Sequence, residues 1–492
     1  MNTFDAAKTS HRNRYDSDVP PNLLEFMLKS WKPSRANPSG VLPNAGNFRQ
    51  RRERLSKQFV GELLVIPSGH LKVRANDTYY AFRPGTDFYY LTGNLEPDCV
   101  LVLRPGGLDS EDHEALLFVE PNPGKTDATF FTDRIKGELW EGPRLGVRDS
   151  EVRYAVACRP LPELESVLTA ALALPNARWR VLRGLSAVTE RSLGRDSKAQ
   201  RERDAQLATY LSEMRLIKDA VEVKALQSAV SATKRGFEDV IGRLKSAASE
   251  RELEGVFWTR ARMEGNDVGY SSIVASGAHA CTLHWRKNDG AIRKGDLLLL
   301  DAGIEGHSLY TADVTRTLPI SGSFSREQRA IYELVLEAQR GALRLVRPGN
   351  DFMAPNTAAM RILAQGLERL KILPMPAEVA LREQNQFYRR YSLHNVSHML
   401  GLDVHDCAQA RAENYKYGKL EPGMVLTVEP GLYFQTDDLT VPAKYRGIGV
   451  RIEDDVLVTA AGHRVLSKSL PSDPDAVERW MKQVWRRRRA KA

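Results

Sequence analysis

The amino-acid sequence predicts a mixed α/β (α+β) protein built from two successive domains. Its 492 residues exceed the length that one hydrophobic core usually organises. Between residues 48 and 205, short apolar strands alternate with helical pieces, which is typical of an α/β domain. Between residues 271 and 459, further apolar strands carry acidic residues. A composition of 42% hydrophobic and 27% charged residues indicates a soluble globular protein.

Changes in sequence pattern predict the domain boundaries. Residues 1–45 form a polar N-terminal extension, in which only residues 22–31 (NLLEFMLKSW) have the spacing of an amphipathic helix. The first domain is expected over residues 46–205, the second over 206–475, and a basic, solvated tail over 476–492. No apolar run approaches the ~18 residues that span a bilayer, and the N-terminus lacks the apolar stretch of a signal peptide. We therefore expect a cytoplasmic protein without a membrane partner.

The first domain should begin with a charged helix and continue as a sheet. The helix is expected over residues 48–59, FRQRRERLSKQF. Strands are expected at 62–67, 87–93 (DFYYLTG), 99–105 and 114–121, and helices at 161–174 and 198–216. No phosphate-binding glycine loop occurs among these elements.

The second domain is expected to open with a long helix at 217–245 and a second helix after the S-x-x-E capping box at Ser249–Glu252. Residues 271–277 and 281–285 have the pattern of paired strands, and residues 295–318 that of a hairpin. Further helices are predicted from Ser325 to Pro348, at 356–371 and at 376–390, and further strands at 424–433 and 447–459.

The net charge of +9 raises the possibility of a nucleic-acid partner. Part of the excess lies in the tail, at Arg486 to Arg489 and Lys491, and aromatic residues are not interleaved with the basic ones as a base-stacking surface requires. We therefore expect no nucleic-acid binding.

The four cysteines are widely separated and form no C-x-x-C pair, so we expect small buried side chains outside the functional site.

Residues 394–406, HNVSHMLGLDVHD, gather three of the chain's 10 histidines within thirteen positions. A neutral imidazole is the commonest metal ligand and a frequent proton shuttle. One histidine in an apolar, strand-like segment is more often structural than functional. Three together, next to Gly401, which permits a close backbone approach, indicate a functional site.

Four acidic residues interrupt otherwise apolar strands, and burying them is costly unless each is paired or bound to a metal. They are Asp301, Asp313, Glu429 and Glu453. The two aspartates would face each other across the predicted hairpin and repel, which a shared cation would relieve. With His398 they form an oxygen-rich set that suits Mn²⁺, with Co²⁺ or Zn²⁺ as alternatives. Four negative charges balance two divalent ions, which could hold a hydroxide between them and polarise a carbonyl.

Five motifs occur in an order and spacing that carry a family resemblance. They are LLDAG-x(8)-ADVTRT, HNVSHMLGLDVHD, VLTVEPGLY, YRGIGVRIEDD and, near the N-terminus, DFYYLTG-x-x-EPDCVLVL. The sequence resembles the metallopeptidase family of aminopeptidase P, prolidase and methionine aminopeptidase, and within it the Xaa-Pro aminopeptidase (aminopeptidase P) branch. The resemblance covers residues 46–475. It implies an N-terminal domain of the creatinase/aminopeptidase P type followed by a catalytic domain with the pita-bread fold.

The resemblance also implies a role for each site residue. The metal ligands would be Asp301, Asp313, His398, Glu429 and Glu453, with Asp313 and Glu453 bridging two ions. Glu429 would in addition accept a proton from the metal-bound water. The histidines that bind substrate and transfer protons would be His284, His394 and His405, with His284 and His405 acting in catalysis. Arg451 would orient a metal-binding aspartate.

The implied activity is hydrolysis of the N-terminal Xaa-Pro bond of peptides by a metal-bridging hydroxide, in a homodimer or homotetramer. Two alternatives remain open. One is a prolidase, which cleaves Xaa-Pro dipeptides, and the other is an inactive pita-bread protein that only binds a partner. The family's second residue in the histidine motif is usually small, whereas this chain has Asn395, so we expect a local packing change that leaves catalysis intact.

Overall fold

The computed structural model describes residues 19–32, 40–194 and 197–489, and its contacts divide the chain into two units, Met1–Leu211 and Ser212–Ala492. The division falls between Leu211 and Ser212, whereas the boundary expected from the sequence, between residues 205 and 206, stays a prediction. Of the N-terminal extension, residues 1–18 and 33–39 lie outside the described residues. The amphipathic patch expected at 22–31 is helical over α2 (Pro21–Met27), which has no buried residue.

The first unit is built on a five-stranded sheet with the strand order β6-β5-β4-β1-β7. The strands are β1 (Glu62–Pro67), β4 (Val100–Pro105), β5 (His113–Val119), β6 (Ala157–Pro160) and β7 (Arg178–Val181). Strands β1, β4 and β5 pair antiparallel, whereas the edge strands β6 and β7 pair parallel with their neighbours. A small hairpin, β2 (Val73–Ala75) and β3 (Thr78–Tyr79), stands apart from this sheet.

Helices cover the sheet because its side chains are apolar on both faces. In β1, Leu63 and Val65 pack against α8 (Leu164–Leu172), whereas the alternate residues Leu64 and Ile66 are also fully buried. The remaining helices are α3 (Ala45–Gln58), α4 (Thr86–Thr92), α5 (Thr129–Thr132), α6 (Glu138–Glu141), α7 (Gly146–Tyr154), α9 (Ala187–Ser192) and α10 (Lys198–Met214), and η1 (Leu161–Glu163) is a 3₁₀ turn.

The expected strand at residues 87–93 is wrong, because this segment is the helix α4. Its aromatic residues are typical of a strand, but Gly93 ends the helix with a left-handed φ of 70°, and the Gly93 N–H donates to the carbonyl of Tyr89 at 2.8 Å. Phe88, Tyr89 and Tyr90 are buried. Tertiary packing therefore outweighs the strand preference of these residues.

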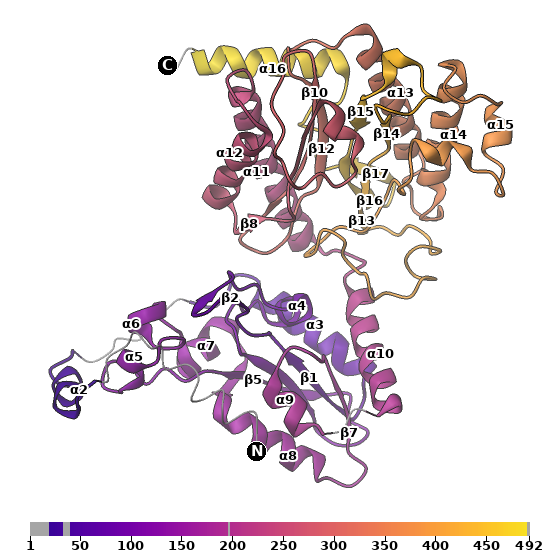
Figure 1. Ribbon diagram of the computed structural model, residues 1–492. Coiled ribbons are helices and arrows are strands. Elements are labelled where there is room, and N and C mark those ends of the chain that lie inside the picture. The colour runs from indigo at the N-terminus through magenta and orange to yellow at the C-terminus, as the bar shows by residue number, and fades with distance from the viewer. Residues whose placement is uncertain (1–18, 33–39, 195–196, 490–492) are drawn as a thin grey trace. The chain divides into compact units, whose positions relative to one another are not determined.

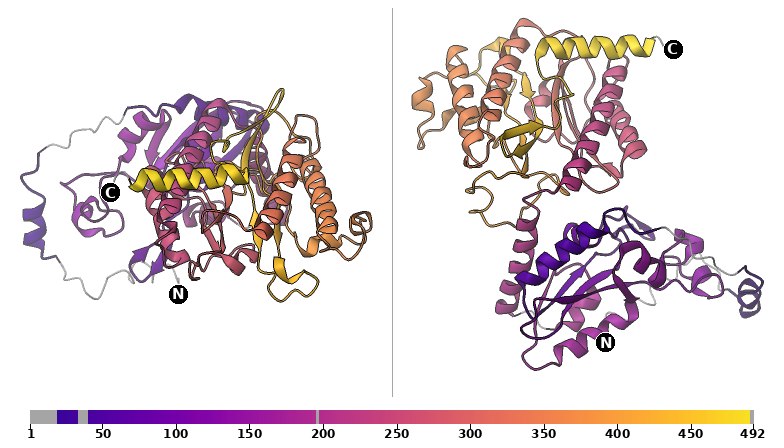
Figure 2. Two further views of the ribbon diagram at one scale, coloured as in Figure 1. Left: turned by 90° about the horizontal axis from the view of Figure 1, so that it is seen from above. Right: turned by 180° about the vertical axis from the view of Figure 1, so that it is seen from behind.

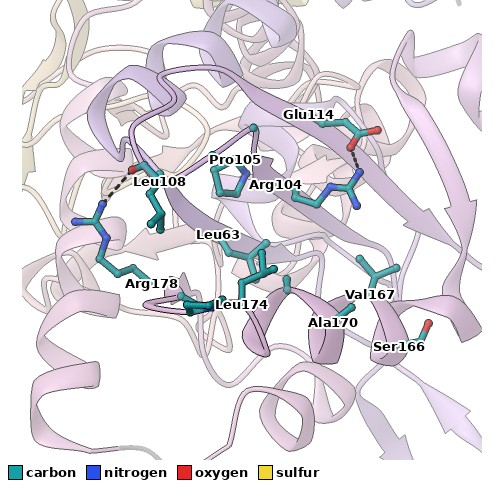
Figure 3. Close-up of a pocket in the computed structure, with 16 residues that line it drawn as sticks. Leu63, Arg104, Pro105, Leu108, Glu114, Ser166, Val167, Ala170, Leu174 and Arg178 are labelled. Atoms are coloured by element: carbon teal, nitrogen blue, oxygen red, sulfur yellow. Dashed lines mark hydrogen bonds and ion pairs between the residues drawn. The ribbon is translucent and has the colours of Figure 1, made fainter.

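The first unit also contains a cavity of about 900 Å³ between α8 and the sheet. Figure 3 shows that Leu63 and Leu174 face each other across it, with Arg104 and Arg178 on opposite sides. None of the site residues predicted from the sequence lines this cavity.

The second unit consists of two helix pairs with strands between them (Figure 1). The first pair is α11 (Ala220–Leu244) with α12 (Glu250–Glu264), and the second is α13 (Arg326–Leu343) with α14 (Ala354–Arg369). The predicted caps are present, since the Ser249 side chain accepts from the Glu252 N–H and Ser325 forms a capping box with Gln328.

The strands of the second unit form several short ladders. The first ladder has the order β12-β10-β9, from β9 (Ile273–Ser276), β10 (Leu297–Ala302) and β12 (Val314–Pro319), and the second has the order β13-β16-β17, from β13 (Val425–Val428), β16 (Asp454–Thr459) and β17 (Gly462–Val465). Two-stranded ladders pair β8 (Asp267–Val268) with β11 (Ile304–Glu305), and β14 (Gly431–Tyr433) with β15 (Gly449–Arg451). The hairpin expected at 295–318 is present as the antiparallel pair β10 and β12.

Two expected elements of this unit are wrong. Residues 281–285 do not pair with β9, because the 3₁₀ turn η2 (Gly277–Cys281) and a loop follow it, and β10 takes the place beside β9. The helix expected at 376–390 is reduced to α15 (Ala377–Ala380) and the 3₁₀ turn η3 (Phe387–Arg390). A further 3₁₀ turn is η4 (Ala443–Tyr445).

The basic C-terminal segment, expected as a solvated tail, is the helix α16 (Pro474–Arg489), which contacts α11 and α13 (Figures 1 and 2). Its face of Val477, Trp480, Met481 and Val484 is buried, while Arg486 to Arg488 are exposed. The segment is thus an amphipathic helix that covers part of the core, and Lys491 lies outside the described residues. Across the described ranges, no helix combines the length and apolar character that crossing a membrane requires.

Candidate metal centre and active site

The four carboxylates predicted as ligands lie where strands end or are interrupted. Asp301 is the next-to-last residue of β10, and Asp313 directly precedes β12. Glu429 follows β13 and Glu453 precedes β16. Because β13 and β16 are antiparallel and Val428 pairs with Asp454, Glu429 and Glu453 stand next to each other just beyond the last pair of the ladder.

Backbone hydrogen bonds to other segments explain these interruptions. The Glu429 N–H donates to the carbonyl of Val396 at 2.8 Å, and the Glu453 N–H donates to the carbonyl of Thr315 at 3.1 Å. These two bonds tie the second ladder to the histidine segment and to β12. The side chains at the interruptions consequently point to one place from different parts of the chain.

The histidine segment, residues 394–406, runs alongside β13 but does not form a regular strand. The Thr427 N–H donates to the carbonyl of His398, and the Leu400 N–H donates to the carbonyl of Val425, both at 2.9 Å. Only Met399 and Leu426 form a bridge of the β type. The strand-like character expected from the sequence is therefore limited to an extended stretch of a few residues.

All five predicted ligands line one cavity of about 560 Å³. Ligand atoms of Asp313, His398 and Glu453 lie within 4.8 Å of one another. The His398 Nε2 atom is 3.3 Å from an Asp313 oxygen and 3.5 Å from a Glu429 oxygen. The His398 Nδ1 atom donates to the carbonyl of Met399 at 3.1 Å, which leaves the Nε2 atom to face the carboxylates.

Burial and mutual repulsion dominate the electrostatics of the five groups. Burial raises the pKa of Asp301, Glu429 and Glu453, and the neighbouring carboxylate of Asp313 raises each of them further. Burial alone would lower the pKa of His398, but its hydrogen bond to Asp313 and the charge of Glu429 outweigh this effect and raise it. The centre therefore favours bound cations or protons.

These residues fit divalent cations. Four carboxylates and one imidazole form a donor set that is rich in oxygen and suits hard or borderline ions. Arg451 is a buried cation beside the centre, and it balances one negative charge at most. A buried group of carboxylates with so little compensation is expected to be stabilised by metal.

Arg451 connects the centre to the surrounding side chains. Its Nη2 atom donates to an Asp301 oxygen at 2.5 Å, and its Nη1 atom donates to the Tyr433 hydroxyl at 2.9 Å. The same hydroxyl is 2.8 Å from the His394 Nε2 atom. The structure thus places the Arg451 guanidinium against Asp301, one of the predicted ligands, and the orienting role that the resemblance implies stays a prediction.

The three remaining predicted histidines line the same cavity from two segments. The His405 ring lies edge-on to the His398 ring, with centroids 4.4 Å apart. His284 is an exposed residue of the loop after η2. Burial lowers the pKa of His284 and His405, and lowers that of His394 to about 4, with positive neighbours adding to the effect. All three rings are therefore favoured in the neutral form.

Sequence reasoning missed two hydroxyl groups that touch the ligands. The Tyr270 hydroxyl is 2.6 Å from an Asp301 oxygen and 2.5 Å from an Asp313 oxygen, and the Thr315 hydroxyl donates to Glu453 at 2.6 Å. Tyr270 lies 31 positions before Asp301, and nothing in its local sequence distinguishes it. Thr315 belongs to the ADVTRT motif, and this motif was the feature of the sequence that could have identified it.

A further buried carboxylate, Asp406, holds the segment that carries His405. Its oxygen accepts from Arg215 Nε at 3.0 Å, and the fully buried Lys218 ammonium is 3.8 Å away. Burial would raise the pKa of Asp406, but the charges of Arg215 and Lys218 lower it. Asp406 is therefore paired with two cations rather than available as a ligand.

The cysteines lie where they are expected, whereas the effect expected of Asn395 stays a prediction. Asn395 is exposed at the cavity, and its carbonyl accepts from His394 Nδ1 at 2.9 Å. It is not among the described residues with a positive φ, so its side chain causes no left-handed backbone strain. Cys99, Cys158, Cys281 and Cys407 are free and buried, and none lines the cavity.

Comparison with known families covers both units. The family model of metallopeptidase family M24 matches residues 224–460, and that of the aminopeptidase P N-terminal domain matches residues 48–179. These ranges contain, respectively, all five predicted metal ligands and the sheet of the first unit up to the start of β7.

The chain is also similar to individual proteins over most of its length. Xaa-Pro aminopeptidase 1 of Streptomyces coelicolor is 49% identical over 465 residues, which cover 94% of this chain and 92% of that protein. The structure of Escherichia coli aminopeptidase P with the inhibitor Pro-Leu has a TM-score of 0.79 and 33% identity, and covers 91% of this chain and 99% of that one. A zinc-substituted form of the same protein in complex with product has the same TM-score and identity.

We expect Tyr270→Phe to weaken metal binding about tenfold, because the hydroxyl that orients Asp301 and Asp313 is lost while the ring is retained. Titration of metal-free protein with Mn²⁺ measures the effect. Tyr332→Phe is the matched control, since it removes a buried hydroxyl that donates to the carbonyl of Ser472 away from the cavity. Equal affinities of Tyr270→Phe and the unaltered protein would contradict the assigned role.

Proposed function

The chain belongs to metallopeptidase family M24, in its aminopeptidase P branch, and we propose that it removes the N-terminal residue from peptides whose second residue is proline. The observation that carries the proposal is the convergence of all five predicted ligands and all three predicted histidines on one cavity. A binding protein without activity would not need the complete set. The chain is thus assigned as a metal-dependent aminopeptidase.

Two divalent ions, most readily Mn²⁺, would be held by Asp301, Asp313, His398, Glu429 and Glu453. When bound, they activate a water molecule for attack and polarise the scissile carbonyl. The number of two follows from charge, since four carboxylates balance two divalent ions. Asp313 and Glu453 are the proposed bridging ligands, in agreement with the short separation of their oxygens from each other and from His398 Nε2.

Glu429 is suited to accept the proton of the attacking water. Burial raises the pKa of Glu429, and the positive charge of His398 opposes this shift. A base with a pKa closer to neutrality than an ordinary glutamate can take up a proton and release it again during turnover. Its second oxygen lies 3.6 Å from His394 Nδ1, so a neighbouring imidazole stands beside the same carboxylate.

The neutral histidines are suited to hydrogen bonding with the substrate. His284 and His405 can donate to the carbonyl oxygen as negative charge develops on it. His394 shares the Tyr433 hydroxyl with Arg451, which fixes the orientation of its ring. A prolyl peptide bond has no N–H of its own to donate, so these donors act on the carbonyl side of the bond.

Three finer features remain predictions from the sequence. They are Mn²⁺ rather than Co²⁺ or Zn²⁺, a homodimer or homotetramer, and a cytoplasmic location. The exposed Asn395 at the cavity is proposed to influence which N-terminal residues are preferred.

We expect Glu429→Gln to lower kcat toward an Xaa-Pro-containing peptide at least a hundredfold at saturating Mn²⁺, because the proton acceptor is lost. Peptide hydrolysis and bound metal are measured on the same preparation. Glu421→Gln, an exposed carboxylate outside the cavity, is the control and should keep full activity. Unaltered activity of Glu429→Gln would refute its role.

We expect the affinity of metal-free protein for Mn²⁺ to rise with pH between 6 and 8. The pKa values of His398 and Glu429 are raised, so protons that remain on these groups must leave before the ion binds. Calorimetry in buffers with different ionisation enthalpies measures both the affinity and the protons released. An affinity that is independent of pH, with no proton release, would contradict this expectation.

We expect cleavage of peptides of three or more residues with proline in second position, since the similarity to Xaa-Pro aminopeptidases extends over both units. Incubation with Gly-Pro and with a longer Xaa-Pro peptide, followed by product analysis, separates this activity from that of a prolidase. Cleavage of the dipeptide alone would show that the chain has the activity of a prolidase. Failure to cleave either peptide with Mn²⁺ present would favour a binding protein.

A further inference from the structure

His284 is held by a loop rather than by packing around its ring. We use the name 276–290 loop for the stretch from Ser276, the last residue of β9, through η2 to Gly290, ahead of β10. His284 is exposed, so its position in the cavity depends on the conformation of this loop. The contacts that fix the loop therefore also fix the position of His284.

Glu250, the first residue of α12, is a fully buried carboxylate outside the metal cavity, with 0% of its surface exposed. One oxygen accepts from the Ser276 N–H at 2.7 Å and from His279 Nδ1 at 2.9 Å. The other accepts from Trp285 Nε1 at 2.8 Å and from the Gly290 N–H at 2.7 Å. Four donors on two oxygens match the bonding pattern of a carboxylate, and a buried carboxylate needs such partners.

These four donors are distributed over the whole loop. Ser276 and Gly290 are its two ends, and Trp285 directly follows His284. The rings of His279 and Trp285 stack with centroids 3.8 Å apart, so both side chains reach Glu250 together. One carboxylate thus connects the start of the loop, its end and the neighbour of His284.

The surroundings of Glu250 are built for this contact. The Glu250 N–H donates to the carbonyl of Gly290 at 2.9 Å, which makes the link to the loop end reciprocal. A Cβ atom at Gly290 would lie 2.7 Å from a Glu250 oxygen and 2.6 Å from His279 Nδ1, so only glycine allows this approach. The carboxylate also stands at the N-terminus of a fifteen-residue helix, where negative charge is favoured.

We propose that Glu250 is a positioning residue that holds the 276–290 loop so that His284 faces the metal cavity. The proposal rests on the proposed function, because it concerns the part that His284 takes in peptide hydrolysis. It adds a carboxylate that touches neither metal nor substrate and acts through a histidine.

The central test is Glu250→Gln in the full-length, metal-loaded protein. An amide has only one acceptor oxygen, so its NH₂ group would face two of the four donors. We expect kcat to fall roughly tenfold to a hundredfold, with a smaller change in KM and unchanged metal content. Glu252→Gln, on the same helix but bonded to Arg243 and Ala248, is the matched control and should change kcat less than about twofold.

A double-mutant cycle with His284→Ala separates positioning from general damage. If Glu250 acts through His284, Glu250→Gln should lower kcat by less than about twofold once His284 is absent. Losses that multiply in the double variant would overturn the proposal, because Glu250 would then act independently of His284. Wild-type kcat in Glu250→Gln would overturn it as well.

A milder variant covers the case in which Glu250→Gln does not fold. Trp285→Phe removes one donor to Glu250 and keeps an aromatic ring on His279, and kcat should fall roughly threefold to tenfold. Trp258→Phe is its control, because it removes an indole bond to Asp267 on the surface. Equal kcat values for the two variants would contradict the proposal.

Hydrogen–deuterium exchange gives a readout that does not depend on activity. The amides of Ser276 and Gly290 should exchange faster in Glu250→Gln than in Glu252→Gln, because their acceptor is altered. Unchanged exchange in a folded Glu250→Gln variant would overturn the proposal while leaving the proposed function intact. If wild-type protein cleaved no Xaa-Pro peptide, the proposed function would fail, and faster exchange would then assign Glu250 to loop stability alone.

Discussion

The second unit is organised by the burial of four carboxylates around one imidazole, an arrangement that is costly without compensation. The four carboxylates lie at or beside strand ends, and the backbone N–H groups of Glu429 and Glu453 turn away from their own ladder toward another segment. The neighbouring groups also serve the carboxylates, since Arg451, Tyr270 and Thr315 all direct hydrogen bonds to them. The ladders are short and interrupted because the cavity requires several strand ends in one place. Regular strand pairing therefore stops where the carboxylates come together.

Buried carboxylates have two different uses in this unit. Those at the centre have too few donors and favour cations, whereas Glu250 accepts four hydrogen bonds and Asp406 pairs with Arg215 and Lys218. Glu250 and Asp406 hold the segments that carry His284 and His405. The protein therefore places its four proposed carboxylate ligands at or beside strand ends and its proposed substrate histidines on loops, and it fixes the loops with charge. This division gives the ligands a rigid frame. The shape of the cavity where these loops line it therefore depends on a small number of hydrogen bonds.

The sequence was most informative where residue chemistry and local pattern disagree. Asp301, Asp313, Glu429 and Glu453 are conspicuous because carboxylates are unusual among buried strand residues, and the structure places all four with His398 in one cavity. Tyr270 and Glu250 give no such signal, since a tyrosine before a strand or a glutamate at a helix start is ordinary, and their importance lies in contacts distant in sequence. The helix α4, the loop at 281–285 and the packed helix α16 were missed for a related reason, because tertiary contacts outweighed local preference.

The spread of the ligands along the chain has a consequence for biosynthesis. Asp301 is the first ligand to be synthesised and Glu453 the last, and at usual translation rates they are separated by about 8 to 30 seconds. The helix α16, which buries part of the core, follows later still. An incomplete chain that ends before residue 453 therefore lacks one of the five proposed ligands. Any activity that needs all five proposed ligands is therefore delayed until residue 453 has been synthesised.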